Sequence, residues 1–129
     1  MSRHVPLASI LALALAMHTG PPAFGGGADA SAEAERALKD KVARATRMLA
    51  REGLLGSSGH VSARVPGTAR VLIGPADVSR DLVSGEDVVA VDLDSRPLDK
   101  VHRPPLETEI HTGVYRARPD VMADRKSVV

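Results

Sequence analysis

The sequence predicts a small domain of the α+β or layered α/β type, with two helices flanking short antiparallel strands. Apolar residues recur at helical spacing over residues 31–53 and again over residues 106–118. Between them, short runs rich in β-branched residues alternate with turns rich in Gly, Pro and Ser. The hydrophobic content is 43% but the aromatic content is only 2%, so we expect an aliphatic core rich in alanine.

Residues 1–30 have the features of a secretory signal. Arg3 and His4 give a short basic start, residues 5–17 form an apolar run, and residues 28–30 (Ala-Asp-Ala) match an A-x-A cleavage site. The run is too short to span a bilayer comfortably, so we expect a periplasmic or secreted mature protein without membrane contact. The alternative is a start codon assigned too far upstream, which would leave the protein cytoplasmic.

The first predicted helix, residues 31–53, opens a domain that we expect to cover residues 31–123. Ser31 is positioned to cap it, and Gly53 is expected to end it. The basic residues lie mostly off the apolar stripe, which is typical of a solvated helix face. The stripe consists of Leu38, Val42, Ala45 and Leu49, with Met48 beside it.

Three short strands are predicted after this helix. A Gly/Ser turn at residues 56–59 leads into a strand at 60–65, and a turn at 66–68 joins it as a hairpin to a strand at 70–73. A third strand covers residues 88–92.

The last predicted helix begins near Leu106, after two prolines at 104–105, and ends at residues 116–118, before Pro119. Its predicted apolar stripe consists of Leu106, Ile110 and Val114, with Tyr115 beside them. Glu107 lies in the first turn, where free backbone N–H groups favour an ionised carboxylate. On spacing alone, such a glutamate is a common helix-start residue.

This segment also matches a P-x-x-E-x-x-x-H-x-x-x-Y-x-x-R-P-D-V pattern. The matching residues are Pro104, Glu107, His111, Tyr115, Arg118, Pro119, Asp120 and Val121. Upstream, residues 59–64 (Gly-His-Val-Ser-Ala-Arg) are close to G-N-x-S-x-R. On these residues the chain resembles the class II aldolase/adducin family from Ala37 to Ala123. The resemblance implies a three-layer α/β/α fold, of which this chain holds an incomplete N-terminal half.

The resemblance also implies roles for individual residues. It implies that Glu107 is the catalytic acid/base, and that Gly59, His60 and Ser62 bind the anionic group of a small-molecule substrate. Small residues and a hydroxyl suit that task because they let backbone N–H groups approach an anion.

Four departures from the family pattern fall in the same anion pocket. Ala76 and Asp77 stand where a hydroxyl residue and a glycine are usual, and Asp77 would place a carboxylate near an anion. Pro105 and Leu106 replace the two serines of sugar-phosphate aldolases. With His60 in place of asparagine, the resemblance implies a non-phosphorylated substrate that carries carboxylate and carbonyl groups.

The family resemblance implies a divalent metal ion, usually zinc, held by three histidines. Two belong to an H-x-H soon after the Ala123 position and one lies much further on, and this chain has none of the three. We therefore expect zinc for a full-length parent and no metal site in this chain. Glu107 and His111 share a helix face, but two ligands are too few for a metal site. His102 is expected to be a loop residue and His111 a helix-packing residue.

Residues 124–129 (Asp-Arg-Lys-Ser-Val-Val) replace the buried apolar strand that the family pattern predicts next. We expect these six residues to be a non-native tail encoded by a sequencing adapter, and a natural frameshift is the alternative.

The resemblance predicts a truncated member of the family. Its parent would be a metal-dependent carbon–carbon lyase acting by aldol cleavage or decarboxylation, and this chain alone would be inactive. The alternatives are a non-catalytic adducin-like binding module and an epimerase on the same scaffold. A homotetramer is expected only for the parent. The net charge of +1 and the absence of a basic run interleaved with aromatic residues argue against nucleic acid. The sequence has no cysteine, which excludes disulfides and thiolate metal sites.

Overall fold

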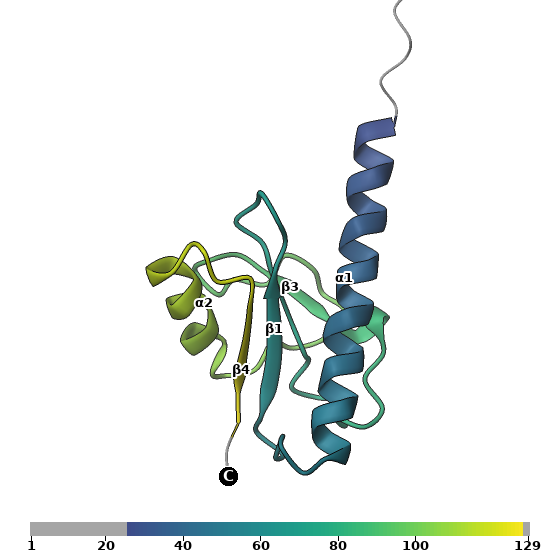
Figure 1. Cartoon of the computed structure of the whole chain (residues 1–129), viewed down its shortest axis with the longest axis vertical. Coiled ribbons are helices and arrows are strands. Elements are labelled where there is room, and N and C mark those ends of the chain that lie inside the picture. Colours follow the sequence, from purple (N-terminus) through teal and green to yellow (C-terminus); the bar gives the residue numbers. More distant parts are fainter. Residues whose placement is uncertain (1–25, 128–129) are drawn as a thin grey trace, which may run out of the picture.

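A computed structural model describes residues 26–127, which fold into helices on both sides of an antiparallel sheet (Figure 1). In chain order the elements are α1 (Gly26–Arg51), β1 (His60–Arg64), β2 (Val71–Ile73), the 3₁₀ turn η1 (Gly85–Asp87), β3 (Val89–Val91), α2 (Thr108–Ala117) and β4 (Ala123–Lys126). The predicted layered α/β class is confirmed, and the three predicted strands agree with β1, β2 and β3 to within one residue at each end.

The sheet has the strand order β3-β2-β1-β4, and every neighbouring pair is antiparallel. Ser62 in β1 pairs with Ile73 in β2, and His60 pairs with Lys126 in β4. The loop after β3 returns to its free edge, where the Leu98 N–H donates to the Ala90 carbonyl.

Side chains alternate between the two faces of the sheet and so create two separate cores. On the α1 side, Val61, Leu72 and Ala90 pack with buried residues of α1 such as Val42. The opposite core, which contains Tyr115 of α2, is formed with Val71, Ile73, Val89 and Val91. Because β2 and β3 contribute to both cores, the sheet lies between the two helices and the domain has the predicted α/β/α layering.

Helix α1 is longer than predicted. It begins at Gly26, so Ser31 lies inside it and donates from its hydroxyl to the Ala28 carbonyl at 2.8 Å. The prediction that Ser31 caps the helix is therefore wrong, because the alanines before and after it favour a helical conformation. The early turns extend past the sheet (Figure 1), and residues 27–34 are exposed. Gly53 follows the helix with a φ of +68°, as expected of a glycine that ends a helix.

Helix α2 begins at Thr108, with Glu107 as the residue that precedes its first turn. The predicted apolar stripe is wrong for its first residues, because Leu106 is fully exposed and Ile110 is half-exposed. The buried residues of α2 are Thr108, His111, Thr112 and Tyr115. This face is mostly polar because it meets polar groups of the neighbouring segments, and only Tyr115 belongs to both the predicted stripe and the observed one.

Residues 123–126 form the edge strand β4, which the sequence does not predict because Asp124, Arg125 and Lys126 are polar. An edge strand tolerates such residues, since one of its edges is exposed to water. Whether residues 124–129 are native stays a prediction.

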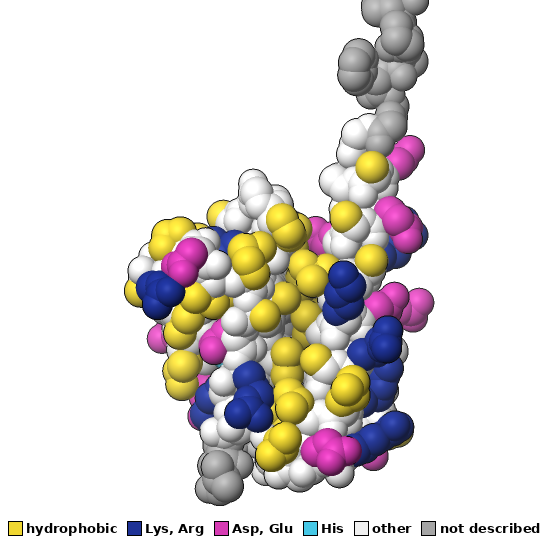
Figure 2. All heavy atoms as spheres, in the orientation of Figure 1, with side chains coloured by type: hydrophobic (Ala, Val, Ile, Leu, Met, Phe, Trp, Pro, Cys, Tyr) yellow, Lys and Arg dark blue, Asp and Glu magenta, His cyan; other side chains and the backbone are white. Residues whose placement is uncertain are grey.

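Most of the predicted signal segment, residues 1–25, lies outside the described residues, and so does its apolar run. The predicted cleavage site at residues 28–30 lies within α1. Within residues 26–127, neither helix has the length and apolar character needed to cross a bilayer. Hydrophobic side chains remain visible along the line where α1 meets the sheet (Figure 2).

Candidate functional site

The turn before β1 needs a glycine at position 59. A Cβ atom there would lie 2.7 Å from the Leu55 Cδ1 atom and 3.3 Å from the Lys126 carbonyl oxygen. The Gly59 N–H donates to the Gly56 carbonyl at 3.0 Å, so this amide is already used within the turn. The turn delivers His60 to the start of β1, where the side chain is 5% exposed.

Ser62 lies two residues further along β1 and is fully buried beneath α2. Its Oγ atom is 2.9 Å from His111 Nδ1 and 2.8 Å from the Tyr115 hydroxyl. His111 Nδ1 also lies 2.9 Å from Asp124 Oδ2. The structure thus confirms His111 as a helix-packing residue, and the Ser62 hydroxyl joins β1 to α2 in the interior.

Glu107 lies at the N-terminal end of α2, and 38% of its side chain is exposed. Its Oε1 atom accepts a hydrogen bond of 2.5 Å from Lys126 Nζ, and its Oε2 atom is 3.9 Å from His60 Nδ1. The hydrogen bond from Lys126 holds the pKa of the Glu107 carboxyl below its usual value. Glu107 is therefore an ionised carboxylate at neutral pH, which is the form that accepts a proton.

Two histidines lie next to this carboxylate, with ring centroids 6.4 Å apart and rings at 78°. Burial, followed by the nearby charge of Arg80, lowers the pKa of His60 to about 4. Burial also lowers the pKa of His111, and the Asp124 carboxylate opposes that effect. At neutral pH, His60 is therefore an uncharged imidazole.

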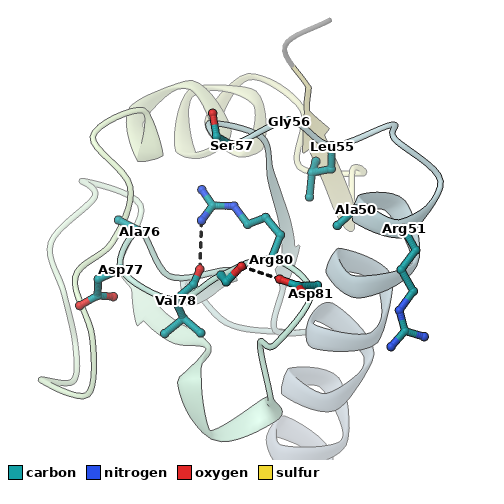
Figure 3. Close-up of a pocket in the computed structure, with 11 residues that line it drawn as sticks. Ala50, Arg51, Leu55, Gly56, Ser57, Ala76, Asp77, Val78, Arg80 and Asp81 are labelled. Atoms are coloured by element: carbon teal, nitrogen blue, oxygen red, sulfur yellow. Dashed lines mark hydrogen bonds between the residues drawn. The ribbon is translucent and has the colours of Figure 1, made fainter.

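Arg80 connects His60 to a neighbouring cavity. The cavity has a volume of about 610 Å³ and is lined by residues 55–57 and 76–81 together with Ala50 and Arg51. The Arg80 guanidinium extends between the segments that carry Ser57 and Ala76 (Figure 3). Its Nη2 atom lies 3.0 Å from His60 Nε2.

The loop that carries Asp77 is tied to the segment before α2. Asp77 Oδ1 lies 3.2 Å from His102 Nδ1, and Asp87 Oδ1 lies 3.2 Å from His102 Nε2. His102 is therefore the loop residue that the sequence predicts, and it links three separate segments.

The four predicted site residues do not form one open pocket. The structure brings His60 and Glu107 together and places Gly59 in the adjoining turn. Ser62 belongs to an interior cluster with His111 and Tyr115 and has no exposed surface.

Three further residues contribute to the site and were not predicted. Asp124 and Lys126 are two positions apart on β4 and both contact residues of the α2 segment, as strand alternation requires. A strand prediction over residues 123–126 would have placed them together. Arg80 lies in a loop 20 residues from His60, and no local pattern indicates their contact.

Within residues 26–127, no group of three or more histidine and carboxylate side chains is arranged to hold a metal ion. Class II aldolases typically depend on a divalent metal ion. Because a metal site needs at least three protein ligands, the donor set of the described residues does not fit that ion.

Together, the fold and the site define an α/β/α domain with a candidate acid/base carboxylate at the head of α2. A family model described as the Class II Aldolase and Adducin N-terminal domain matches residues 40–123, about two thirds of the chain. The chain belongs to this family, which confirms the resemblance predicted over residues 37–123.

Two curated relatives are each 34% identical to this chain. One, from Mycoplasma pneumoniae, is named as a probable L-ribulose-5-phosphate 4-epimerase; the match of 88 residues covers 67% of this chain and 36% of that protein. The other is a 3,4-dihydroxyphthalate decarboxylase from Arthrobacter keyseri; 94 residues match, covering 66% of this chain and 38% of that protein. The chain thus spans less than two fifths of the length of either relative.

A solved structure of an aldolase II superfamily protein from Pseudomonas syringae is similar to the structure of this chain. Its TM-score is 0.63 and its sequence identity is 29%, and the match covers 69% of this chain and 38% of that protein.

Proposed function

We propose that this chain supplies the acid/base residue of a carbon–carbon lyase that works by aldol cleavage or decarboxylation. The observation that carries the proposal is the Glu107 carboxylate, which is ionised, partly exposed and 3.9 Å from the buried His60 imidazole. A partly exposed carboxylate beside a water-poor surface can accept a proton from a bound substrate.

In aldol cleavage, Glu107 would accept the proton of the hydroxyl that lies β to the substrate's carbonyl. The O–H electron pair would form a new carbonyl, the adjacent C–C bond would break, and its electron pair would pass into an enolate. Glu107 would then return the proton to the carbon that lost the bond. In decarboxylation, carbon dioxide would leave instead and the electron pair of the broken C–C bond would pass into the enolate. Glu107 would take up a proton from the solvent and deliver it to the same carbon.

The substrate we propose carries carboxylate and carbonyl groups and no phosphate. Asp77 lines the cavity next to the Gly59 turn, and a carboxylate there is unfavourable for a doubly charged phosphate. The relative named as a 3,4-dihydroxyphthalate decarboxylase also bears a name that describes a carboxylated substrate.

Within residues 26–127 the donor set fits no metal ion that could stabilise the charge of the enolate. We therefore propose that the 129-residue chain alone is inactive, and that zinc or another divalent ion and a homotetramer belong to the complete enzyme. The periplasmic or secreted location remains part of this proposal.

Two alternatives have support of their own. An epimerase is favoured by the relative named as a 4-epimerase, and both reactions share an enolate-type intermediate. A non-catalytic adducin-like module is favoured by the lack of a metal-ligating cluster among the described residues.

The test compares this chain with a protein completed from the genomic sequence at its locus. Both are assayed for aldehyde release, carbon dioxide release and epimer formation, with a hydroxy-keto carboxylate and with a sugar phosphate. In the completed protein, Glu107→Gln is expected to lower the rate by about 10²–10⁴-fold, the usual contribution of a general acid/base. Glu109→Gln is the matched control, since Glu109 is exposed on the same helix.

Each outcome separates the candidates. Epimer formation without cleavage supports the epimerase, and no turnover in any assay supports the binding module. Full activity in Glu107→Gln would refute the acid/base role, and a preference for the sugar phosphate would refute the proposed substrate class.

A further inference from the structure

The Arg80 guanidinium is held by main-chain carbonyl groups and a histidine. Its Nε atom donates to the Gly59 carbonyl at 3.0 Å, and its Nη1 atom donates to the carbonyls of Val78 and Pro75 at 3.2 and 3.4 Å. Its Nη2 atom lies 3.0 Å from His60 Nε2. Within residues 26–127, the ion pairs do not include Arg80. This arginine therefore joins the turn before β1 to the loop at residues 75–78.

The contact with His60 fixes where the imidazole carries its proton. A guanidinium has only N–H donors and does not lose its proton in proteins. His60 Nε2 must therefore be the acceptor and cannot carry a hydrogen. A neutral imidazole has one N–H, so the hydrogen must lie on Nδ1.

The groups around His60 keep its imidazole uncharged at neutral pH. The charged and titratable groups that face it are Arg80 from the loop, Lys126 from β4, and Glu107 and His111 from the α2 segment. Burial and the Arg80 charge lower its pKa the most, and only Glu107 among these groups raises it.

The Nδ1–H group faces Glu107 but makes no hydrogen bond. His60 Nδ1 is a buried atom without a hydrogen-bond partner, and the Glu107 carboxylate is 3.9 Å away. Buried N–H groups are rarely left unpaired, and those that are often have a functional explanation. Because this atom has no exposed surface, a substrate oxygen would satisfy the donor once the partly exposed Glu107 side chain moves aside.

We propose that Arg80 is a positioning residue that holds His60 in the Nδ1–H tautomer, so that an uncharged donor faces a substrate carbonyl or carboxylate oxygen beside Glu107. The role of the donor rests on the proposed function. The tautomer itself follows from the contacts of Arg80 and needs no substrate.

This arrangement gives Arg80 a role beyond linking two loops. The three carbonyl contacts alone would hold the loops together and would leave the histidine free to take either tautomer. The fourth contact, with His60, selects one of them. A purely structural arginine would therefore leave the protonation of His60 unchanged when it is replaced, provided that the fold survives.

The test is long-range ¹H–¹⁵N NMR of the histidine rings in the ¹⁵N-labelled 129-residue chain, followed over pH. For the wild-type chain we expect His60 to show the Nδ1–H pattern and to stay neutral down to about pH 4. Arg80→Ala is expected to give a mixture of tautomers and to raise the pKa towards the ordinary value of 6.5. Arg80→Lys, which keeps a charged donor, is expected to restore part of the Nδ1–H population.

Arg51→Ala is the matched control, because Arg51 is an exposed arginine that lines the same cavity. It should leave the His60 signals unchanged. An Nε2–H pattern in the wild-type chain overturns the proposal, even if every Arg80 variant fails to fold. An unchanged tautomer in a folded Arg80→Ala chain overturns it as well.

A second measurement links the tautomer to the substrate. In the completed protein, Arg80→Ala should raise KM for the hydroxy-keto carboxylate, with a partial return in Arg80→Lys. If the tautomer shifts but KM does not, the donor role is overturned. If Glu107→Gln stays fully active while the tautomer behaves as expected, the proposed function fails and the positioning of His60 by Arg80 stands.

Discussion

Replacing Ser62 by alanine removes the hydroxyl that joins β1 to α2 inside the domain. That hydroxyl is fully buried and lies 2.8 Å from the Tyr115 hydroxyl and 2.9 Å from His111 Nδ1. His111 keeps the Asp124 carboxylate as a partner. The phenol hydroxyl of Tyr115 loses its side-chain partner, so most of the cost is expected to come from Tyr115.

The expected loss follows from leaving a buried polar group unpaired, which costs about 1–3 kcal/mol. We therefore expect Ser62→Ala to lower the free energy of unfolding by about 1–3 kcal/mol, with little added by the small space left behind. The double variant with Tyr115→Phe should lose less than the sum of the two single variants, because it removes the unpaired hydroxyl as well.

Urea unfolding followed by far-ultraviolet circular dichroism measures this loss. The backbone signal is needed because Tyr115→Phe removes the one tyrosine of a chain without tryptophan, and with it the intrinsic fluorescence. Ser58→Ala is the control, since Ser58 is exposed. A loss below about 0.5 kcal/mol for Ser62→Ala, the usual range for surface changes, would refute the reasoning. So would full additivity with Tyr115→Phe.

The same tyrosine gives a pH readout. Burial raises the pKa of Tyr115 from 10.0 to about 12, and the hydrogen bond with Ser62 limits that rise. The folded-state pKa is the higher one, so the contribution of protonated Tyr115 to the free energy of unfolding is complete below pH 10. That contribution is lost as the pH rises towards 12. In Ser62→Ala, phenolate absorbance should therefore appear at a still higher pH.

Two further predictions concern the core and the 3₁₀ turn. In urea titrations, Leu72→Ala should lower the free energy of unfolding by about 2–5 kcal/mol, because Leu72 is fully buried in the sheet. The control Leu82→Ala should change it by no more than about 0.5 kcal/mol, because Leu82 is 71% exposed. Hydrogen bonds from Ser84 hold the pKa of the Asp87 carboxyl below its ordinary value of 3.8. The stability that this carboxylate contributes is therefore present above pH 3.8 and is lost as the pH falls through the lowered pKa. When the free energy of unfolding is measured against pH, Asp87→Asn should therefore lose less stability at acid pH than the wild-type chain. An equal loss in both chains would contradict this account.

Most of the secondary structure could be predicted because it depends on local patterns. The strands at residues 60–65, 70–73 and 88–92 combine β-branched residues with turn residues at their ends, and these features do not depend on distant contacts. The start of α1 was missed because Ser31 resembles a cap, although the helix continues through it to Gly26.

The buried face of α2 could not be predicted from hydrophobicity. His111 and Thr112 are completely buried because Ser62, Asp124 and Ser95 provide polar partners for them. Those partners come from three other segments, so a count of apolar residues along the helix selects the wrong face.

The candidate site was predicted only in part for the same reason. The family pattern identified Glu107 and His60, and the structure places them 3.9 Å apart. Arg80 and Lys126, which set the charge around them, reach the site through the fold alone. A position in the sequence carries no information about such contacts unless the sheet register is known.

The pairing of β4 with β1 has a chemical consequence for the N-terminal end of α2. Lys126 reaches Glu107 because it lies opposite His60 at the edge of the sheet. The acidity of Glu107 is therefore controlled from a strand that lies 19 residues away along the chain. A different residue at position 126 would retune the proton affinity of this carboxylate without any change in α2 itself.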